Sequence, residues 1–134
     1  MANITIGVAP EVLVTGRSSS RLSYPGSCHC GSVTVAFGTT EFLADLPLRR
    51  CDCSFCRRHG ARTVSDPDGE LVIRTPGCAL RRYRFGLCIT DMLLCANCGV
   101  YVAALISHKG RDYATLNANV LDARELCLIM GDGT

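Results

Sequence analysis

The sequence predicts an all-β domain, because short runs rich in β-branched and aromatic residues recur along the chain, separated by Pro, Gly and Asp. No long helical periodicity accompanies these runs. The length of 134 residues suits one domain with one modest core. The predicted strands are SVTVAF (32–37), ELVIRT (70–75), ALRRYRF (79–85), DMLLC (91–95), VYVAALIS (100–107) and RDYATLNANV (111–120).

The predicted division of the chain is an N-terminal arm at residues 1–23 and a single domain at residues 24–134. In the arm, EVLVT is either a short edge strand or disordered, and TGRSSSR has the composition of a linker. Shorter features are a turn at Tyr24-Pro25-Gly26, one helical turn in TTEFLADL, a turn at SDPDG, and a last short helix or strand in LDARELCLIMGDGT.

Charge and hydropathy exclude several classes of function. A net charge of +2 and a pI near 8.1 do not favour binding to nucleic acid or to an anionic membrane surface. No apolar run reaches the roughly 18 to 20 residues that a membrane span requires. The first residues lack the pattern of a signal peptide, so we expect a cytoplasmic protein.

Cysteine is unusually frequent, with ten among 134 residues. A reducing cytosol keeps thiols free, which argues against a disulfide framework. The spacings Cys28-x-Cys30 and Cys51-x-Cys53 are also too tight for comfortable disulfides within each pair. Metal thiolates tolerate such spacing, so metal binding is the favoured interpretation.

Seven of the cysteines form three clusters: Cys28 and Cys30; Cys51, Cys53 and Cys56; Cys95 and Cys98. Four thiolates close a tetrahedral zinc site, and three leave one position open, as catalytic zinc usually does. Cys95-x-x-Cys98-Gly99 is typical of a zinc knuckle and needs a second pair, for which Cys28-x-Cys30 is available. The partition predicts two zinc ions per chain, one closed and one open.

The middle cluster has alternatives. It is expected to form a tight turn entering a short helix that ends at Gly60. His59 could supply a fourth ligand and close the site, or it could simply cap the helix. Alternatively, one of the three remaining cysteines completes the cluster, although such cysteines are more often small hydrophobic residues of the core. These three are Cys78, Cys88 and Cys127.

The segments GSCHCGSVTV, CDCSFCRRHG and LLCANCGVYV, in this order, resemble the glutathione-dependent formaldehyde-activating enzyme family, which includes centromere protein V. The resemblance covers roughly residues 24 to 120. It implies a β-tent of two small antiparallel sheets stapled by zinc, with short helical turns. It also implies a structural zinc on Cys28, Cys30, Cys95 and Cys98, and a catalytic zinc on Cys51, Cys53 and Cys56.

Three thiolates leave a formal charge of −1 on a zinc centre, so its bound water is acidified less than on neutral histidine ligands. A sulfur-rich zinc suits an incoming thiol or a thiol adduct. The expected function is a carbon–sulfur lyase acting on a thiol–aldehyde adduct such as S-(hydroxymethyl)glutathione, with glutathione a possible co-substrate. The alternative is a non-catalytic zinc-binding module or a glutathione or thiol carrier.

Other residues near the middle cluster are candidates for supporting roles. Arg58 and His59 are the first candidates for catalysis, the histidine as a proton shuttle. Five arginines surround the cluster in sequence and could neutralise thiolate charge or attract a carboxylate: Arg49, Arg50, Arg57, Arg58 and Arg62. Asp52 and Ser54 are expected to hydrogen-bond near the sulfurs. His29 is expected at the surface, and packing is the expected role of Tyr83, Phe85, Tyr101 and Tyr113.

Overall fold

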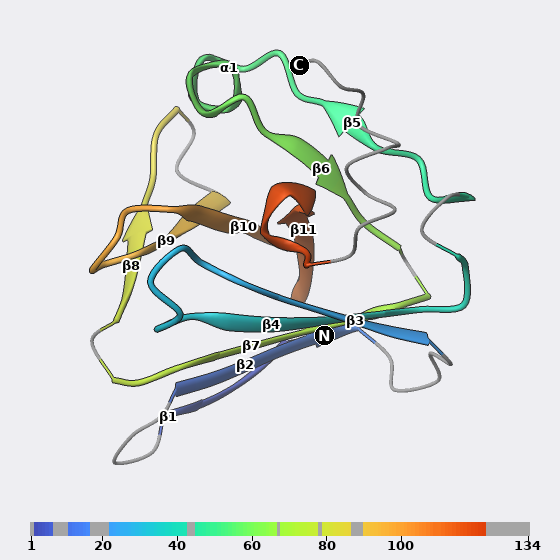
Figure 1. Ribbon diagram of the computed structural model, residues 1–134, viewed down its shortest axis with the longest axis horizontal. Helices are drawn as coiled ribbons and strands as arrows, with labels where there is room; N and C mark the ends of the chain where they lie inside the picture. Colours follow the sequence, from blue (N-terminus) through green and yellow to red (C-terminus); the bar gives the residue numbers. More distant parts are fainter. Residues whose placement is uncertain are drawn as a thin grey trace.

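Two antiparallel β-sheets make up most of the protein, which confirms the predicted all-β class (Figure 1). The computed structural model describes residues 2–6, 11–16, 22–42, 45–66, 68–77, 79–86 and 90–122. Within these ranges, helical structure is confined to short segments that include α1 (Ser54–His59) and η2 (Ala118–Val120). No helix of the described residues is long and apolar enough to cross a membrane.

The first sheet has five strands in the order β1-β2-β7-β4-β3. The strands are β1 (Ala2–Ile6), β2 (Glu11–Gly16), β7 (Glu70–Thr75), β4 (Thr34–Thr39) and β3 (Leu22–Ser27). The predicted strand EVLVT corresponds to β2, and it is an inner strand because β1 and β7 pair with it on either side. Much of TGRSSSR lies outside the described residues.

The second sheet has six strands in the order β5-β6-β11-β10-β9-β8. The strands are β5 (Arg49–Arg50), β6 (Arg62–Val64), β11 (Arg111–Asn117), β10 (Tyr101–His108), β9 (Thr90–Cys95) and β8 (Leu80–Tyr83). β5 and β6 were not predicted, because two- and three-residue strands are too short to show an alternating pattern. Figure 1 places α1 at the opposite end of the molecule from β1 and β2.

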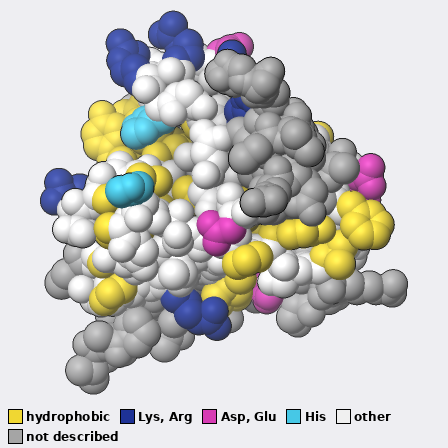
Figure 2. Space-filling model, viewed as in Figure 1, with side chains coloured by type: hydrophobic (Ala, Val, Ile, Leu, Met, Phe, Trp, Pro, Cys, Tyr) yellow, Lys and Arg dark blue, Asp and Glu magenta, His cyan; other side chains and the backbone are white. Residues whose placement is uncertain are grey.

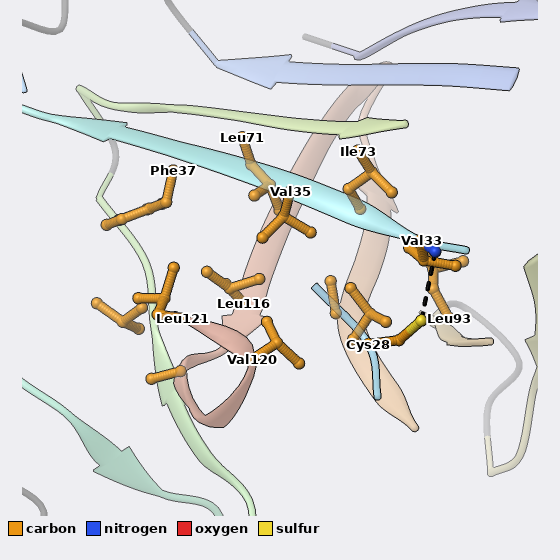
Figure 3. Packing of buried hydrophobic residues seen from close by; sticks show 14 of the residues in the cluster. Cys28, Val33, Val35, Phe37, Leu71, Ile73, Leu93, Leu116, Val120 and Leu121 are labelled. Atoms are coloured by element: carbon orange, nitrogen blue, oxygen red, sulfur yellow. Dashed lines mark hydrogen bonds between the residues drawn. The ribbon is translucent and has the colours of Figure 1, made fainter. Parts of the chain in front are cut away.

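The main core lies between the two sheets, where alternate residues of each strand point to the same side (Figure 3). β4 contributes Val35 and Phe37, and β7 contributes Leu71 and Ile73, all at most 5% exposed. A second, smaller cluster lies against α1 and contains Cys56, Ala61, Met92, Tyr101 and Ala104. The second sheet therefore buries residues on both of its faces.

The predicted turn at Tyr24-Pro25-Gly26 is wrong, because these residues lie within β3. β3 is the last strand in the order of the first sheet, and an edge strand tolerates proline, which lacks an N–H for the ladder. Gly26 has a separate reason to be there. A Cβ on Gly26 would lie 2.3 Å from the carbonyl oxygen of Val120, where the chain after η2 crosses β3.

The remaining short predictions have mixed outcomes. SDPDG forms the expected turn, in which the Gly69 N–H donates to the Asp66 carbonyl at 2.9 Å. In TTEFLADL the Asp45 N–H donates to the Phe42 carbonyl, a turn, while residues 43 and 44 lie outside the described residues. The tail is described only through Asp122.

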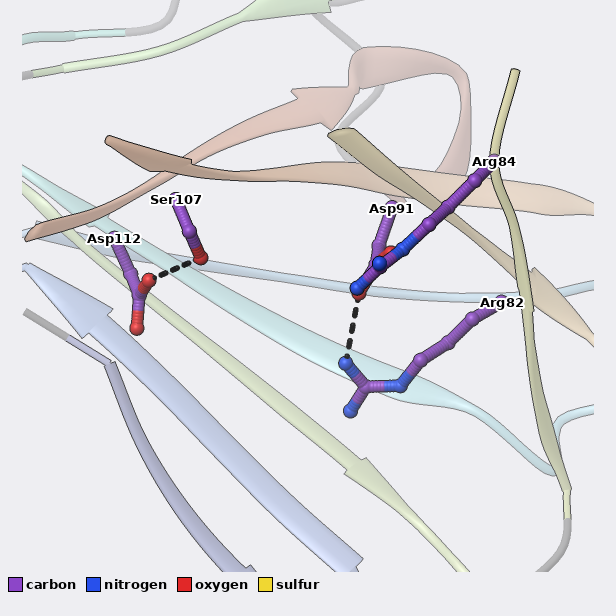
Figure 4. A network of polar contacts seen from close by, with 5 residues as sticks. All are labelled: Arg82, Arg84, Asp91, Ser107 and Asp112. Carbon is purple, nitrogen blue, oxygen red and sulfur yellow. Dashed lines mark hydrogen bonds and ion pairs between the residues drawn. The ribbon is translucent and has the colours of Figure 1, made fainter. Parts of the chain in front are cut away.

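Asp91 anchors the edge strand β8 to β9 (Figure 4). The Asp91 carboxylate is buried and accepts hydrogen bonds from Arg82, at 3.1 Å, and from Arg84. Arg84 is the main cause that lowers the Asp91 pKa below its usual range; burial opposes the shift, and Arg82 adds to it. Since side chains alternate along a strand, Tyr83 and Phe85 then point the other way, toward α1.

Replacing Gly26 tests the close approach of η2 to β3. Gly26→Ala should lower the free energy of unfolding by about 1–3 kcal/mol, because the added methyl group overlaps the Val120 carbonyl. Denaturant unfolding measures the change. Gly77→Ala is the matched control, since a Cβ at Gly77 meets nothing within 4 Å. Equal stabilities of the two variants would contradict the close approach.

Replacing Asp91 tests the ion pairs. Asp91→Asn should lower the free energy of unfolding by about 1–3 kcal/mol at pH 7, because two arginines lose a charged partner. Both arginines are partly exposed, which limits the loss. The folded-state pKa of Asp91 is lowered, so its contribution is complete above pH ~4 and is lost as pH falls further. Unfolding curves of wild type and variant should therefore converge in acid. Asp112→Asn, which removes only an exposed bond from Ser107, should change stability less.

Candidate metal sites

Cys28, Cys30, Cys95 and Cys98 form one group of thiols, whose four Sγ atoms all lie within 4.8 Å of one another. The Sγ atoms of Cys28 and Cys30 are 3.6 Å apart, as are those of Cys30 and Cys95. A tetrahedral zinc with bonds of ~2.3 Å places its sulfur ligands ~3.8 Å apart, whereas a disulfide requires ~2 Å. The donor set therefore fits a metal ion, and the cysteines are free thiols.

Local backbone structure aims these sulfurs inward. Gly31 and Gly99 each follow the second cysteine of a pair and have φ of 85° and 83°, a conformation that glycine adopts without strain. Backbone N–H groups point at the sulfurs: Val33 donates to Cys28 at 3.3 Å (Figure 3). Cys95 accepts two such bonds at 3.4 Å. These bonds stabilise thiolates rather than neutral thiols.

The four-thiol group connects the two sheets. Cys28 and Cys30 lie in the connection from β3 to β4, in the first sheet. Cys95 ends β9 and Cys98 lies in the turn before β10, in the second sheet. A metal ion bound here would link segments 65 residues apart in sequence, as the separation of Cys30 and Cys95 shows.

Cys51, Cys53 and Cys56 form the second group, with their Sγ atoms also within 4.8 Å of one another. The helix α1 positions two of them: Cys53 is the N-cap, and its sulfur accepts the Cys56 N–H at 3.3 Å. Gly60 ends the helix with φ of 61°, which confirms the predicted C-cap. Cys56 is buried, while Cys51 and Cys53 are partly exposed.

No fourth ligand joins this second group among the residues that the structure describes. His59 is not in the group; its ring lies 4.4 Å from the Phe55 ring and 5.6 Å from the Tyr101 ring, measured between centroids. The three other cysteines that could complete the group lie outside the described residues. They are Cys78, Cys88 and Cys127.

The thiols differ in how readily they ionise without a metal. Burial raises the pKa of Cys28 to about 11 and that of Cys56 to about 12. A hydrogen bond with Ser32 lowers the pKa of Cys30 to about 5. Burial opposes ionisation of Cys53, yet the Cys56 N–H and the neighbouring thiols outweigh it, so this pKa is lowered. A metal ion must therefore displace protons from the buried thiols.

An aromatic cluster surrounds the three-thiol group. Phe55, between Cys53 and Cys56, contacts the rings of Tyr83, Phe85 and Tyr101, the last at 4.9 Å and an interplanar angle of 87°. Tyr101 faces this cluster because of a β-bulge. The register of β10 against β9 shifts between Tyr101 and Ala103, which places Tyr101 with Ala104 in the cluster against α1.

A pocket of about 480 Å³ lies beside this cluster. His59 and Tyr101 line it on the side toward the three-thiol group, although none of the three sulfurs lines it. Two amides hold this wall: Asn117 donates to the Tyr101 carbonyl at 2.9 Å, and Asn119 donates to the Gly60 carbonyl at 3.2 Å. The remaining lining residues are Ser27, Cys28, His29, Val100, Val120, Leu121 and Asp122.

The other predicted site residues lie around the three-thiol group without bonding to its sulfurs in the described contacts. The Arg58 guanidinium donates to the Ser54 carbonyl at 3.0 Å and is exposed. Figure 2 shows basic side chains gathered at the end of the molecule where α1 lies. Arg49, Arg50, Arg57, Asp52 and Ser54 are exposed, and Arg62 is partly buried. His29 is exposed, as predicted.

Three residues of this region were not predicted to belong to a site: Tyr101, Asn117 and Asn119. Packing is the role predicted for Tyr101 because the residue falls in a strand-like run, and its direction depends on a bulge that alternation does not reveal. Asn117 ends β11 and Asn119 lies in η2, and the local signal is an N-cap pattern, in which the Asn119 N–H donates to the Asn117 side chain at 3.2 Å.

The chain is similar to a protein of Rhodobacter sphaeroides known from a crystal structure. The two are 32% identical, the match covers 76% of this chain and 94% of the Rhodobacter chain, and the TM-score is 0.56. The chain belongs to the family of this Rhodobacter protein. No family model matches the chain. The similarity to the Rhodobacter protein supports the two-sheet architecture, and the resemblance to the formaldehyde-activating family stays a prediction.

Counting bound metal tests both groups of thiols. We expect two zinc ions per chain, and one in each of the variants Cys53→Ser and Cys95→Ser, measured by elemental analysis of the purified protein. Cys95→Ser should also lower the melting temperature far more than Cys53→Ser, because only the four-thiol group links the two sheets. Full zinc content in either variant would contradict the assignment of its ligand.

Proposed function

We propose that the protein is a zinc-dependent carbon–sulfur lyase that acts on a thiol–aldehyde adduct such as S-(hydroxymethyl)glutathione. The observation that carries the proposal is the contrast between the two groups of thiols. One has four sulfurs and can enclose an ion; the other has three, with no fourth ligand side chain among the described residues. Three protein ligands with an open position are typical of catalytic rather than structural zinc.

The donor set favours sulfur chemistry over hydrolysis. Cys51, Cys53 and Cys56 would hold the ion, and three thiolates already exceed its charge by one. Zinc in this setting supplies a soft Lewis acid to which a thiol or thioether sulfur can bind. Two of the three cysteines are partly exposed, so a small molecule can reach the group from solvent.

In addition to the metal, the reaction needs a proton acceptor and an apolar surface that excludes water. In cleavage, the bond between carbon and sulfur breaks with its electron pair going to sulfur, and the adduct's hydroxyl loses its proton as the aldehyde forms. The His59 imidazole, placed three residues after Cys56, is the candidate to accept that proton. The rings of Phe55 and Tyr101 exclude water from one side of the thiols.

The charges nearby suit an anionic thiol such as glutathione. Arg57 and Arg58 are exposed on the same helix as Cys56, and Arg49 and Arg50 are exposed on β5 just before Cys51. These side chains can approach the carboxylates of a bound tripeptide, each contact being exposed and therefore weak. Such contacts would attract an anionic thiol adduct without selecting one thiol over another.

Exchange between formaldehyde, glutathione and their adduct, followed by NMR exchange spectroscopy, tests the proposal. Zinc-loaded wild type should accelerate the exchange above the spontaneous rate. Cys53→Ser should lose one zinc and return the rate to the spontaneous value while keeping the fold. His59→Ala should keep both zinc ions and lose about 100-fold in rate, because only the proton acceptor is removed.

Cys30→Ser is the matched control, since it also removes a zinc ligand but from the four-thiol group. Its folded fraction should keep the wild-type rate. If wild type binds adduct without accelerating exchange, the protein is a thiol carrier instead. If it neither binds nor accelerates, a non-catalytic zinc module is the remaining function.

A further inference from the structure

Tyr101 combines a buried ring with a hydroxyl that has no hydrogen-bond partner among the described residues. The residue is 2% exposed. The Asn117 side chain bonds to the residue at its backbone carbonyl, which accepts at 2.9 Å, and not at the hydroxyl. Buried tyrosines usually find a hydrogen-bond partner in the protein. Among the described residues, this hydroxyl is instead left available to water or to a ligand.

The hydroxyl must reach a space open to solvent. Within the described structure, no polar side-chain atom is both fully enclosed and without a partner. Tyr101 and His59 both line the pocket described above. Tyr101 therefore lies between that pocket and the three-thiol group, with which it packs.

The position of the ring is fixed rather than adaptable. Tyr101 packs in one cluster with Cys56, and Cys51, Cys53 and Phe55 pack against the same cluster. Phe55 meets the ring edge-on, the His59 ring lies 5.6 Å away between centroids, and the Asn117 amide holds the backbone. A donor held this way needs no reorganisation when a substrate binds.

We propose that the Tyr101 hydroxyl donates a hydrogen bond to the oxygen of the adduct's hydroxymethyl group, on the carbon that bears the sulfur. This inference rests on the proposed lyase function and assigns the residue that recognises its substrate. In cleavage, the hydrogen bond from Tyr101 stabilises the hydroxymethyl oxygen while the proton on that oxygen moves to His59. The electron pair of the carbon–sulfur bond moves to sulfur. In the reverse direction, the hydrogen bond stabilises the negative charge that develops on the aldehyde oxygen as the thiolate adds.

The substrate class follows from this donor. The protein should bind adducts whose hydroxyl sits on the carbon attached to sulfur, and it should bind simple thioethers of the same size more weakly. S-(Hydroxymethyl)glutathione offers that oxygen and S-methylglutathione lacks it, while the tripeptide is identical. A site with an unpaired buried donor discriminates against the ligand that leaves the donor unpaired.

Tyr101→Phe removes only the hydroxyl and keeps the ring contacts. The exchange rate per bound zinc should fall about 100-fold, which is the usual loss for one such donor. Independently of turnover, calorimetry should show wild type binding the hydroxymethyl adduct about 10-fold more tightly than S-methylglutathione. The variant should bind both equally. Its melting temperature and zinc content should match wild type, since the lost hydroxyl has no protein partner.

Tyr83→Phe is the matched control, because Tyr83 contacts the same Phe55 ring but is 50% exposed. It should behave as wild type in both measurements. If Tyr101→Phe keeps both the rate and the binding preference, the role of Tyr101 is overturned while the lyase function stands. If wild type shows the preference without acceleration and the variant loses it, recognition by Tyr101 stands and the lyase function fails. A fall in melting temperature of the variant with the preference intact would show a structural role and overturn the proposal.

Discussion

The meeting of four cysteine sulfurs from two different sheets is the constraint on which this structure depends. As thiolates these groups repel one another, and as thiols Cys28 and Cys95 are buried with only weak hydrogen bonds. A bound cation removes both penalties and turns the group into a link between the β3–β4 and β9–β10 connections. A small domain has a core of modest size that supplies limited stability. Metal binding by some of the ten cysteines would add to it.

The second group of thiols depends on how α1 is held against the second sheet. α1 has six residues, too few to be stable in isolation, so packing and capping must hold it. The Cys53 sulfur caps its first turn, and Cys56 and Phe55 fix it against the outer face of the second sheet. That face is aromatic because Arg82 and Arg84 bind Asp91 on the opposite side of β8 and leave Tyr83 and Phe85 directed at the helix.

Predictions from the sequence succeeded where the signal was local or where a count of ligands left one choice. Local spacing gave three clusters of cysteines, the need for four ligands joined two of them across 65 residues, and Gly60 ended the helix as its position indicated. The predictions failed where packing between distant segments decides. Pro25 and Gly26 suggested a turn, yet they lie in an edge strand whose glycine admits the backbone of Val120. For the segment that forms β2, the sequence left a strand and a disordered arm as alternatives. Pairing of β2 with β1 and with β7 decides for the strand.

The sequence by itself determined the fold class, the pairs of thiols and the backbone conformations at Gly31 and Gly99, since alternation, short ligand spacings and glycine turns act over a few residues. The tertiary structure alone decided which face Tyr101 occupies and what surrounds it. Strict alternation along β10 would separate Tyr101 from Ala104, and one bulge places them together. That bulge, with the amides of Asn117 at the end of β11 and Asn119 in η2, forms a pocket wall beside the three thiols. Its parts come from separate segments, so no local pattern encodes it.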